Sequence, residues 1–239
     1  MRIGMNLLMW GQRRAQDLPG VLREAADAGY DTVELPPLGD RQVALEALEA
    51  NGLKVGASHT GLENIEKALD GQLDWLERTG ARFLACSAGD QLTGKAYDEA
   101  AARLNAAGAR CREHGVTFCY HNHAHEIVHD LFGLERILRG TDPENVHLCV
   151  DTYWVARGGQ DPVDIISRLG DRIGFMHLKD MAPDGDFAEV GQGRLDWEGI
   201  RKAVTAAGIP LAMVEQDRTK RTPLESASLS RRFLREHWA

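Results

Sequence analysis

The stretch WEGIRKAVTAAGIPLAMVE, from Trp197 to Glu215, contains the repeating unit that decides the fold. Trp197 to Ala207 has apolar residues at helical spacing, Gly208 follows, and Leu211 to Glu215 is a short apolar run that ends on a carboxylate. A glycine just past a helix readily adopts the left-handed conformation that ends the helix. The stretch therefore predicts a helix, a glycine stop and a buried strand.

The same unit recurs along most of the chain. Four further glycine stops are Ala28-Gly29-Tyr30, Asn51-Gly52-Leu53, Thr79-Gly80-Ala81 and His114-Gly115-Val116. The predicted strands are Arg2 to Asn6, Thr32 to Leu35, Lys54 to Ser58, Phe83 to Ser87, Thr117 to Tyr120, Val146 to Val150, Gly174 to His177 and Leu211 to Glu215. The predicted helices are Leu18 to Ala28, Gln42 to Ala50, Ile65 to Arg78, Tyr97 to His114, Leu134 to Leu138, Val163 to Leu169, Trp197 to Ala207 and Ser226 to His237. Apolar strands separated by helices are typical of a parallel sheet covered on its outer face.

Such a sheet either closes into a barrel or stays open. No Gly-x-Gly-x-x-Gly follows the first strand, where an open dinucleotide-binding sheet would place its phosphate turn. A length of 239 residues suits one large α/β domain. We therefore predict an α/β fold, a (β/α)8 TIM barrel that occupies residues 1–239 as a single domain.

Composition narrows the function classes. The formal net charge of −8 argues against nucleic acid as a partner, because phosphate binding needs clustered Lys and Arg. No signal peptide and no bilayer-spanning apolar run is seen, so no membrane partner and a cytoplasmic location are expected. The four cysteines form no CxxC pair and are predicted to be buried free thiols.

A barrel collects its functional groups at the carboxyl ends of its strands. Asp151 ends HLCVD, His177 ends IGFMH and Glu215 ends LAMVE. A buried carboxylate or imidazole has to be paired, hydrogen-bonded or coordinated. Oxygen and imidazole donors suit Mn²⁺, Mg²⁺, Co²⁺, Fe²⁺ or Zn²⁺, of which we favour Mn²⁺. The alternative is an ion-paired network without a metal.

Six short motifs together carry a family resemblance. They are GYDTVEL at Gly29 to Leu35, YHNHAHE at Tyr120 to Glu126, VDTYW at Val150 to Trp154, MHLKD at Met176 to Asp180, GQGRLDW at Gly191 to Trp197, and VEQD at Val214 to Asp217. In this order the chain resembles the xylose isomerase-like barrel superfamily of sugar isomerases, epimerases and inosose dehydratases, which also includes endonuclease IV.

The resemblance implies that Asp151, His177 and Glu215 ligate a divalent metal. A fourth ligand, usually Glu, ends strand five in the family, but here His121-Asn122-His123 stands in its place. Two alternatives follow: His121 coordinates from the usual position, or Glu126 folds back from the loop. We favour Glu126, because a second carboxylate better neutralises a dication.

The resemblance also implies the chemistry, which is metal-assisted removal of a proton beside a carbonyl of a sugar or keto-sugar. Return of the proton would give an isomerase or epimerase, the favoured function. Loss of a β-leaving group would instead give a lyase or dehydratase on a keto-sugar or keto-inositol. The expected catalytic residues are His121, His123 and Glu215, and the expected substrate-binding residues are Glu34, His59, Trp154 and Lys179.

Two rival functions differ in class. A DNA-repair endonuclease is disfavoured by the acidic balance and by missing ligands, whereas a non-catalytic sugar-binding barrel would result from loss of chemistry at strand five. The polar, Gly-rich segment Asp184 to Gly193 is predicted to be a loop over the mouth. Pairing into a homo-oligomer is an expectation from fold analogy.

Overall fold

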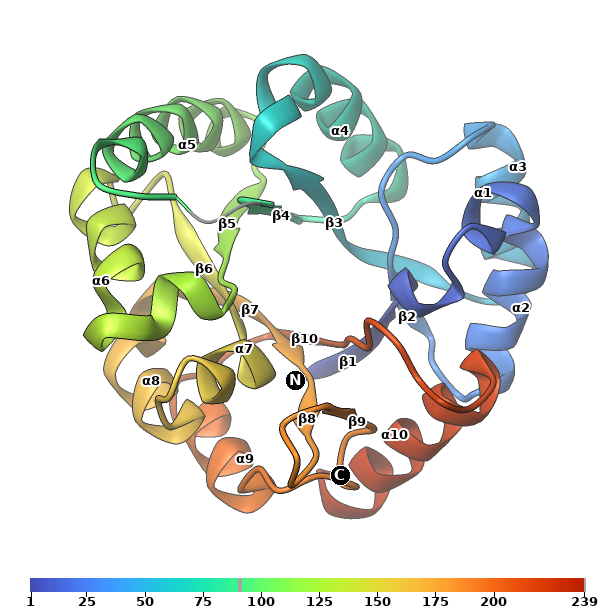
Figure 1. Ribbon diagram of the computed structural model, residues 1–239. Helices are drawn as coiled ribbons and strands as arrows, with labels where there is room; N and C mark the ends of the chain where they lie inside the picture. The colour runs from blue at the N-terminus through green and yellow to red at the C-terminus, as the bar shows by residue number, and fades with distance from the viewer. Residues whose placement is uncertain (90–91, 239) are drawn as a thin grey trace.

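The computed structural model describes residues 1–89 and 92–238, and their strands close into one parallel barrel. The order around the barrel is β1-β10-β7-β6-β5-β4-β3-β2, so the first and last strands pair and the sheet has no free edge (Figure 1). The barrel strands are β1 (Arg2–Asn6), β2 (Thr32–Glu34), β3 (Lys54–Gly61), β4 (Phe83–Ser87), β5 (Thr117–His121), β6 (His147–Asp151), β7 (Ile173–Leu178) and β10 (Leu211–Val214). The predicted barrel is confirmed.

The helices form a ring outside the strands (Figure 1). They are α1 (Arg13–Gln16), α2 (Leu18–Asp27), α3 (Arg41–Ala50), α4 (Ile65–Thr79), α5 (Lys95–Glu113), α6 (Ala124–Gly140), α7 (Thr152–Arg157), α8 (Pro162–Leu169), α9 (Trp197–Ala206) and α10 (Pro223–His237). Aspartate side chains cap several of their first turns. Asp17, Asp40, Asp161 and Asp196 each accept a hydrogen bond from a backbone N–H of the helix that follows, which satisfies a donor that has no partner inside the helix.

The predicted glycine stops are also confirmed. Gly29, Gly52, Gly80, Gly115 and Gly208 all have positive φ. Gly80 shows the reason most directly, because it ends α4 in the left-handed conformation with a φ of 71°. A side chain there would be strained, so a glycine at this position sets the length of the helix.

Three features differ from the sequence expectation. Helix α6 begins at Ala124, well before the predicted Leu134, and its helical backbone is interrupted from Val128 to Leu131. The short helices α1 and α7 were not predicted, because four and six residues are too few to show a helical period. Strands β8 (Asp180–Met181) and β9 (Phe187–Ala188) form a small antiparallel hairpin outside the barrel.

The core has an outer layer between strands and helices and an inner layer on the barrel axis. The inner layer consists of Ala57, Ala85, Cys119, Cys149, Phe175, Leu211 and Met213. All four cysteines are buried and free, as predicted. Among the described residues, no helix has both the length and the apolar character needed to cross a bilayer.

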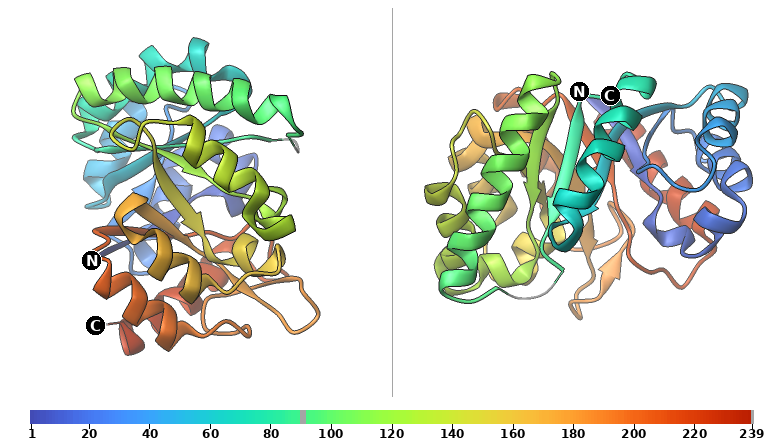
Figure 2. Two further views of the ribbon diagram at one scale, coloured as in Figure 1. Left: turned by 90° about the vertical axis from the view of Figure 1, so that its left-hand side faces the viewer. Right: turned by 90° about the horizontal axis from the view of Figure 1, so that it is seen from above.

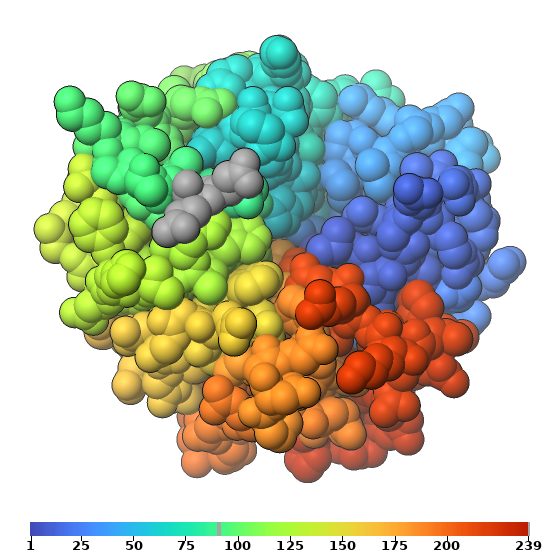
Figure 3. All heavy atoms as spheres, in the orientation of Figure 1, coloured from blue at the N-terminus to red at the C-terminus, as the bar shows by residue number. Residues whose placement is uncertain are grey.

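The two ends of the barrel differ. Both termini lie at the amino end of the strands, and the β8–β9 hairpin extends from the opposite end (Figure 2). Figure 3 shows this opposite face, where the orange hairpin residues and the red residues that follow β10 lie beside the barrel centre. The carboxyl ends of the strands open at this face, which we call the mouth.

Candidate metal centre and active site

Neighbouring strands bring four ionisable side chains together at the mouth. Asp151 of β6 lies beside His177 of β7 in the strand register. The Nδ1 atom of His177 lies 2.8 Å from Oε2 of Glu215. His121, at the end of β5, completes a group whose donor atoms all lie within 4.8 Å of one another. His121, Asp151, His177 and Glu215 are all buried.

The orientation of Asp151 follows from the helix that begins after it. Its Oδ1 atom accepts a hydrogen bond from the backbone N–H of Trp154 at 2.9 Å and so caps α7. The backbone N–H of Asp151 donates to Oδ1 of Asn122 at 3.1 Å. These contacts aim the other oxygen, Oδ2, into the mouth, where it lies 3.3 Å from Nζ of Lys179.

A second row of contacts holds the imidazole of His177. Its Nε2 atom lies 2.7 Å from Oε2 of Glu34. The other oxygen of Glu34 lies 3.1 Å from Nδ1 of His59, whose Nε2 in turn lies 3.0 Å from Oγ of Ser87. Glu34 and His59 therefore lie at the mouth as expected, and Glu34 orients a candidate metal ligand.

Lys179 is the buried cation of the site. Its side chain is 0% exposed, and its Nζ atom lies 2.6 Å from Oε1 of Glu215 and 2.6 Å from Oδ2 of Asp217. The ring of Trp154 lies 5.2 Å from the ammonium. This ring also meets His123 edge-on at 5.5 Å, so it forms part of an aromatic wall beside the site.

The structure does not bring Glu126 to this group. Its carboxylate accepts hydrogen bonds from the Tyr120 hydroxyl at 2.6 Å and from the backbone N–H of His123 at 2.8 Å. It also lies 2.7 Å from Nε2 of His125. The side chain is 0% exposed and closes the first turn of α6. Glu126 therefore lies outside the group of His121, Asp151, His177 and Glu215.

Burial and pairing set the charges of the site. Burial raises the pKa of Asp151 to about 6, against the opposing effect of Lys179. Burial alone would lower the pKa of His177, but Cys149, Glu34 and Glu215 raise it well above its usual value. Burial would likewise lower the pKa of Lys179, which the surrounding carboxylates raise instead. Without a bound ion, the imidazole of His177 and the ammonium of Lys179 are thus charged beside carboxylates, and a metal on His177 would replace its proton.

His121 and His123 have the opposite electrostatics. Burial is the main cause that lowers the pKa of His121 well below its usual value, and the neighbouring His177 adds to it. Burial also lowers the pKa of His123, against a raising effect of Glu126. Both imidazoles are therefore neutral near pH 7, the state in which an imidazole coordinates a metal or accepts a proton.

The residues of this group fit a divalent cation. Nδ1 of His121 is buried and has no hydrogen-bond partner among the described residues, whereas Nδ1 of His177 lies against Glu215 and Oδ2 of Asp151 lies against Lys179. Four carboxylates, those of Glu34, Asp151, Glu215 and Asp217, are connected to the two cations Lys179 and His177, and Glu34 also contacts His59. Buried nitrogen and oxygen donors that lie close together with excess negative charge are what a dication requires.

A cavity of about 310 Å³ opens above the group. His121, His123, Glu34, His59 and Glu215 line it, so these predicted site residues share one space. Lys179 and Trp154 are not among its lining residues. Arg14 also lines the cavity but was not predicted from the sequence, because it belongs to no motif and to no predicted strand end.

Asp180 is a residue whose role the sequence did not reveal. Its buried carboxylate accepts hydrogen bonds from the backbone N–H groups of Gly191 and Gly193 and from Nε1 of Trp197. The motifs MHLKD and GQGRLDW therefore meet in space. Because this contact and the β8–β9 hairpin fix much of the Asp184 to Gly193 segment, the segment is only partly the loop that was predicted.

A closed parallel barrel with ionisable side chains at the carboxyl ends of its strands defines the TIM-barrel class. Residues 22–237 match the family model of the xylose isomerase-like TIM barrel, and the chain belongs to this family. An inosose dehydratase from Geobacillus kaustophilus is 27% identical over 219 residues, which cover 77% of this chain and 70% of the relative.

Solved structures share the fold. A sugar phosphate isomerase/epimerase from Parabacteroides distasonis has a TM-score of 0.82 and 22% identity over 98% of both chains. The IOLI protein with a binding zinc atom has a TM-score of 0.74 and 16% identity, over 98% of this chain and 96% of that one. The match to the family model confirms the resemblance that was stated from the motifs.

Proposed function

We propose that the protein is a divalent-metal-dependent enzyme that removes a proton beside the carbonyl of a keto-sugar or keto-inositol, and that the reaction ends in dehydration. The observation that carries this proposal is the buried donor group of His121, Asp151, His177 and Glu215 at the floor of a cavity. We propose His121, in place of Glu126, as the fourth ligand. A bound dication supplies positive charge where the carbonyl oxygen becomes an oxyanion.

His123 is the residue that we propose as the base. It lines the cavity, and burial lowers its pKa, so it is neutral and able to accept a proton at pH 7. Lys179 cannot take this role, because the surrounding carboxylates keep it protonated. Its fixed positive charge instead holds Glu215 ionised and in place. Glu215, whose pKa lies well below its usual value despite burial, serves as a ligand rather than as a base.

The lack of an available carboxylate after strand β5 favours dehydration over epimerisation. Inversion of a carbon centre needs proton donors or acceptors on both faces of the substrate. In this chain, the carboxylate nearest to strand five, Glu126, is occupied by Tyr120 and by the cap of α6. The match to an inosose dehydratase supports the same choice. An epimerase would share the first step and differ only in where the proton returns.

NMR of candidate substrates in deuterated water tests the proposal. Keto-inositols and keto-sugars are incubated with metal-loaded protein, and exchange beside the carbonyl and any elimination product are read from the same spectra. We expect exchange followed by elimination in the wild type, and neither in His123→Gln at unchanged metal content. His125→Gln is the matched control, because His125 does not line the cavity. Exchange with inversion and no elimination would instead identify an epimerase, and no exchange with any compound would leave only a sugar-binding barrel.

A further inference from the structure

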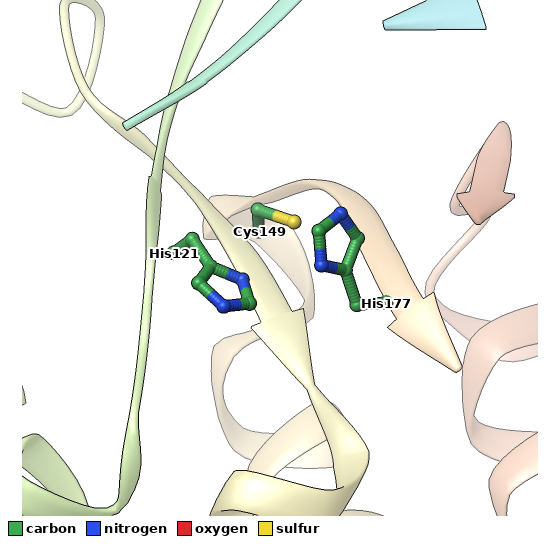
Figure 4. Close-up of side chains that lie close together, drawn as sticks. All are labelled: His121, Cys149 and His177. Carbon is green, nitrogen blue, oxygen red and sulfur yellow. The ribbon is translucent and has the colours of Figure 1, made fainter. Parts of the chain in front are cut away.

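A thiol lies beneath the carboxylates of the candidate metal centre. Cys149 is on β6, two residues before Asp151, so its side chain points to the same inner face of the barrel. In the strand register it lies opposite His121 of β5. Figure 4 shows its sulfur between the imidazoles of His121 and His177. The donor atoms of His121, Cys149 and His177 lie within 4.8 Å of one another.

The surroundings of this thiol differ from those of an ordinary core cysteine. His121 is 2% exposed, yet its Nδ1 atom has no hydrogen-bond partner among the described residues, whereas both ring nitrogens of the buried His177 lie against carboxylates. The rest of the inner layer is apolar, apart from the second thiol of Cys119. An unpartnered imidazole nitrogen of His121 is therefore buried in a region where Cys149 supplies a ligating atom close to both His121 and His177. Leaving such a nitrogen without a partner is costly unless an ion takes the place of one.

We propose that Cys149 is a metal donor, whose thiolate joins His121 and His177 at the floor of the site, so that the site takes zinc or cobalt in preference to manganese or magnesium. The proposal rests on the metal centre of the proposed function and names a ligand beyond it. On binding, the S–H bond is replaced by a metal–sulfur bond, and the thiol proton leaves to solvent. Sulfur and imidazole donors favour zinc and cobalt, whereas oxygen donors suit magnesium and manganese.

Cobalt(II) absorption detects this ligand directly, because thiolate bound to cobalt gives a near-ultraviolet charge-transfer band that nitrogen and oxygen donors do not give. Metal-free protein is titrated with CoCl₂ in the wild type, in Cys149→Ser and in Cys149→Ala. Cys119→Ser is the matched control, since Cys119 is equally buried in the same inner layer but belongs to no donor group among the described residues. We expect the band in the wild type and in the control, and its loss in both Cys149 variants.

Competition between zinc and manganese gives a second measurement. We expect the preference for zinc over manganese to fall by about tenfold or more in Cys149→Ala, since even changes to outer-shell partners of metal ligands alter affinity by about 10- to 100-fold. Circular dichroism checks that each variant is folded. Cobalt binding by the wild type without the sulfur band, or an unchanged zinc-to-manganese ratio, overturns the proposal and leaves the proposed function standing. Failure of the wild type to bind cobalt at all overturns both.

Discussion

Replacement of Lys179 by Met tests whether the acidic group depends on a buried cation. The ammonium is 0% exposed and lies 2.6 Å from Glu215, 2.6 Å from Asp217 and 3.3 Å from Asp151. Removing one partner of a buried ion pair costs about 3–5 kcal/mol, because the remaining charges stay buried without compensation. For a chain of this size, 1 kcal/mol corresponds to roughly 2–4 °C, so we expect the melting temperature of metal-free Lys179→Met to fall by roughly 6–20 °C.

Thermal unfolding followed by circular dichroism, with a chelator and then with a saturating divalent ion, measures this loss. Lys202→Met is the control, because the Lys202 side chain is 68% exposed and its ion pair with Glu198 contributes at most about 1 kcal/mol. A divalent ion should recover much of the stability lost in Lys179→Met, since it replaces the missing positive charge. At roughly 2–4 °C per kcal/mol, a metal-free variant that melts within about 2–3 °C of the wild type has lost only about 1 kcal/mol. In that case the ion pairs of Lys179 do not stabilise the fold and the charge argument is wrong.

Three further predictions concern carboxylates of the site and its surroundings. A divalent ion at about 100-fold above its dissociation constant should stabilise the wild type by about 2.7 kcal/mol, measured as a shift in melting temperature. The same ion should not shift the melting temperature of Asp151→Asn. Asp196→Asn, which alters only a helix cap, should show the same shift as the wild type. Glu126→Gln should lower the free energy of unfolding by about 1–3 kcal/mol, because it weakens a buried helix cap. Its metal content should equal that of the wild type, and loss of the metal would instead show that Glu126 is a ligand. Despite burial, His177 and His59 lower the pKa of Glu34 from 4.5 to about 2. A depressed folded-state pKa stabilises the fold fully above pH 4.5 and less as the pH falls toward 2, so the stability difference between wild type and Glu34→Gln should shrink by up to about 3 kcal/mol over this range.

Most of the fold could be predicted because its signals are local and repeated. Each glycine stop is a backbone requirement that does not depend on distant residues, and all five predicted stops have positive φ. Strand β4 has the predicted bounds of Phe83 and Ser87. The elements that were missed lack such signals. Helix α7 has six residues, and each strand of the β8–β9 hairpin has two, so neither shows a period along the chain.

The candidate site could be predicted only in part, for a different reason. Asp151, His177 and Glu215 end apolar strands, and the sequence marks such ends clearly. The sequence does not show which side chains share a partner across the barrel. The contact of Glu34 with His177 joins residues 143 positions apart, and the three carboxylates around Lys179 come from two different strand ends. The sequence also gave no reason to separate Cys149 from the other buried thiols.

The contacts of Glu126 are the reason why we propose His121 rather than Glu126 as the fourth ligand. In a capping box, a carboxylate three residues after the N-cap residue turns back and accepts a hydrogen bond from the backbone N–H of the N-cap residue. The N-cap residue is usually Ser, Thr, Asp or Asn. Here His123 occupies the N-cap position, so a capping role of Glu126 could not be predicted from the residue types. The Tyr120 hydroxyl donates a hydrogen bond to Oε1, the other oxygen of the Glu126 carboxylate. With Glu126 withdrawn, the strand-five side of the cavity presents two imidazoles of low pKa instead of a carboxylate. One of them can coordinate an ion and the other can take a proton at neutral pH, a division of roles that suits elimination from a keto-sugar better than proton exchange between two carboxylates.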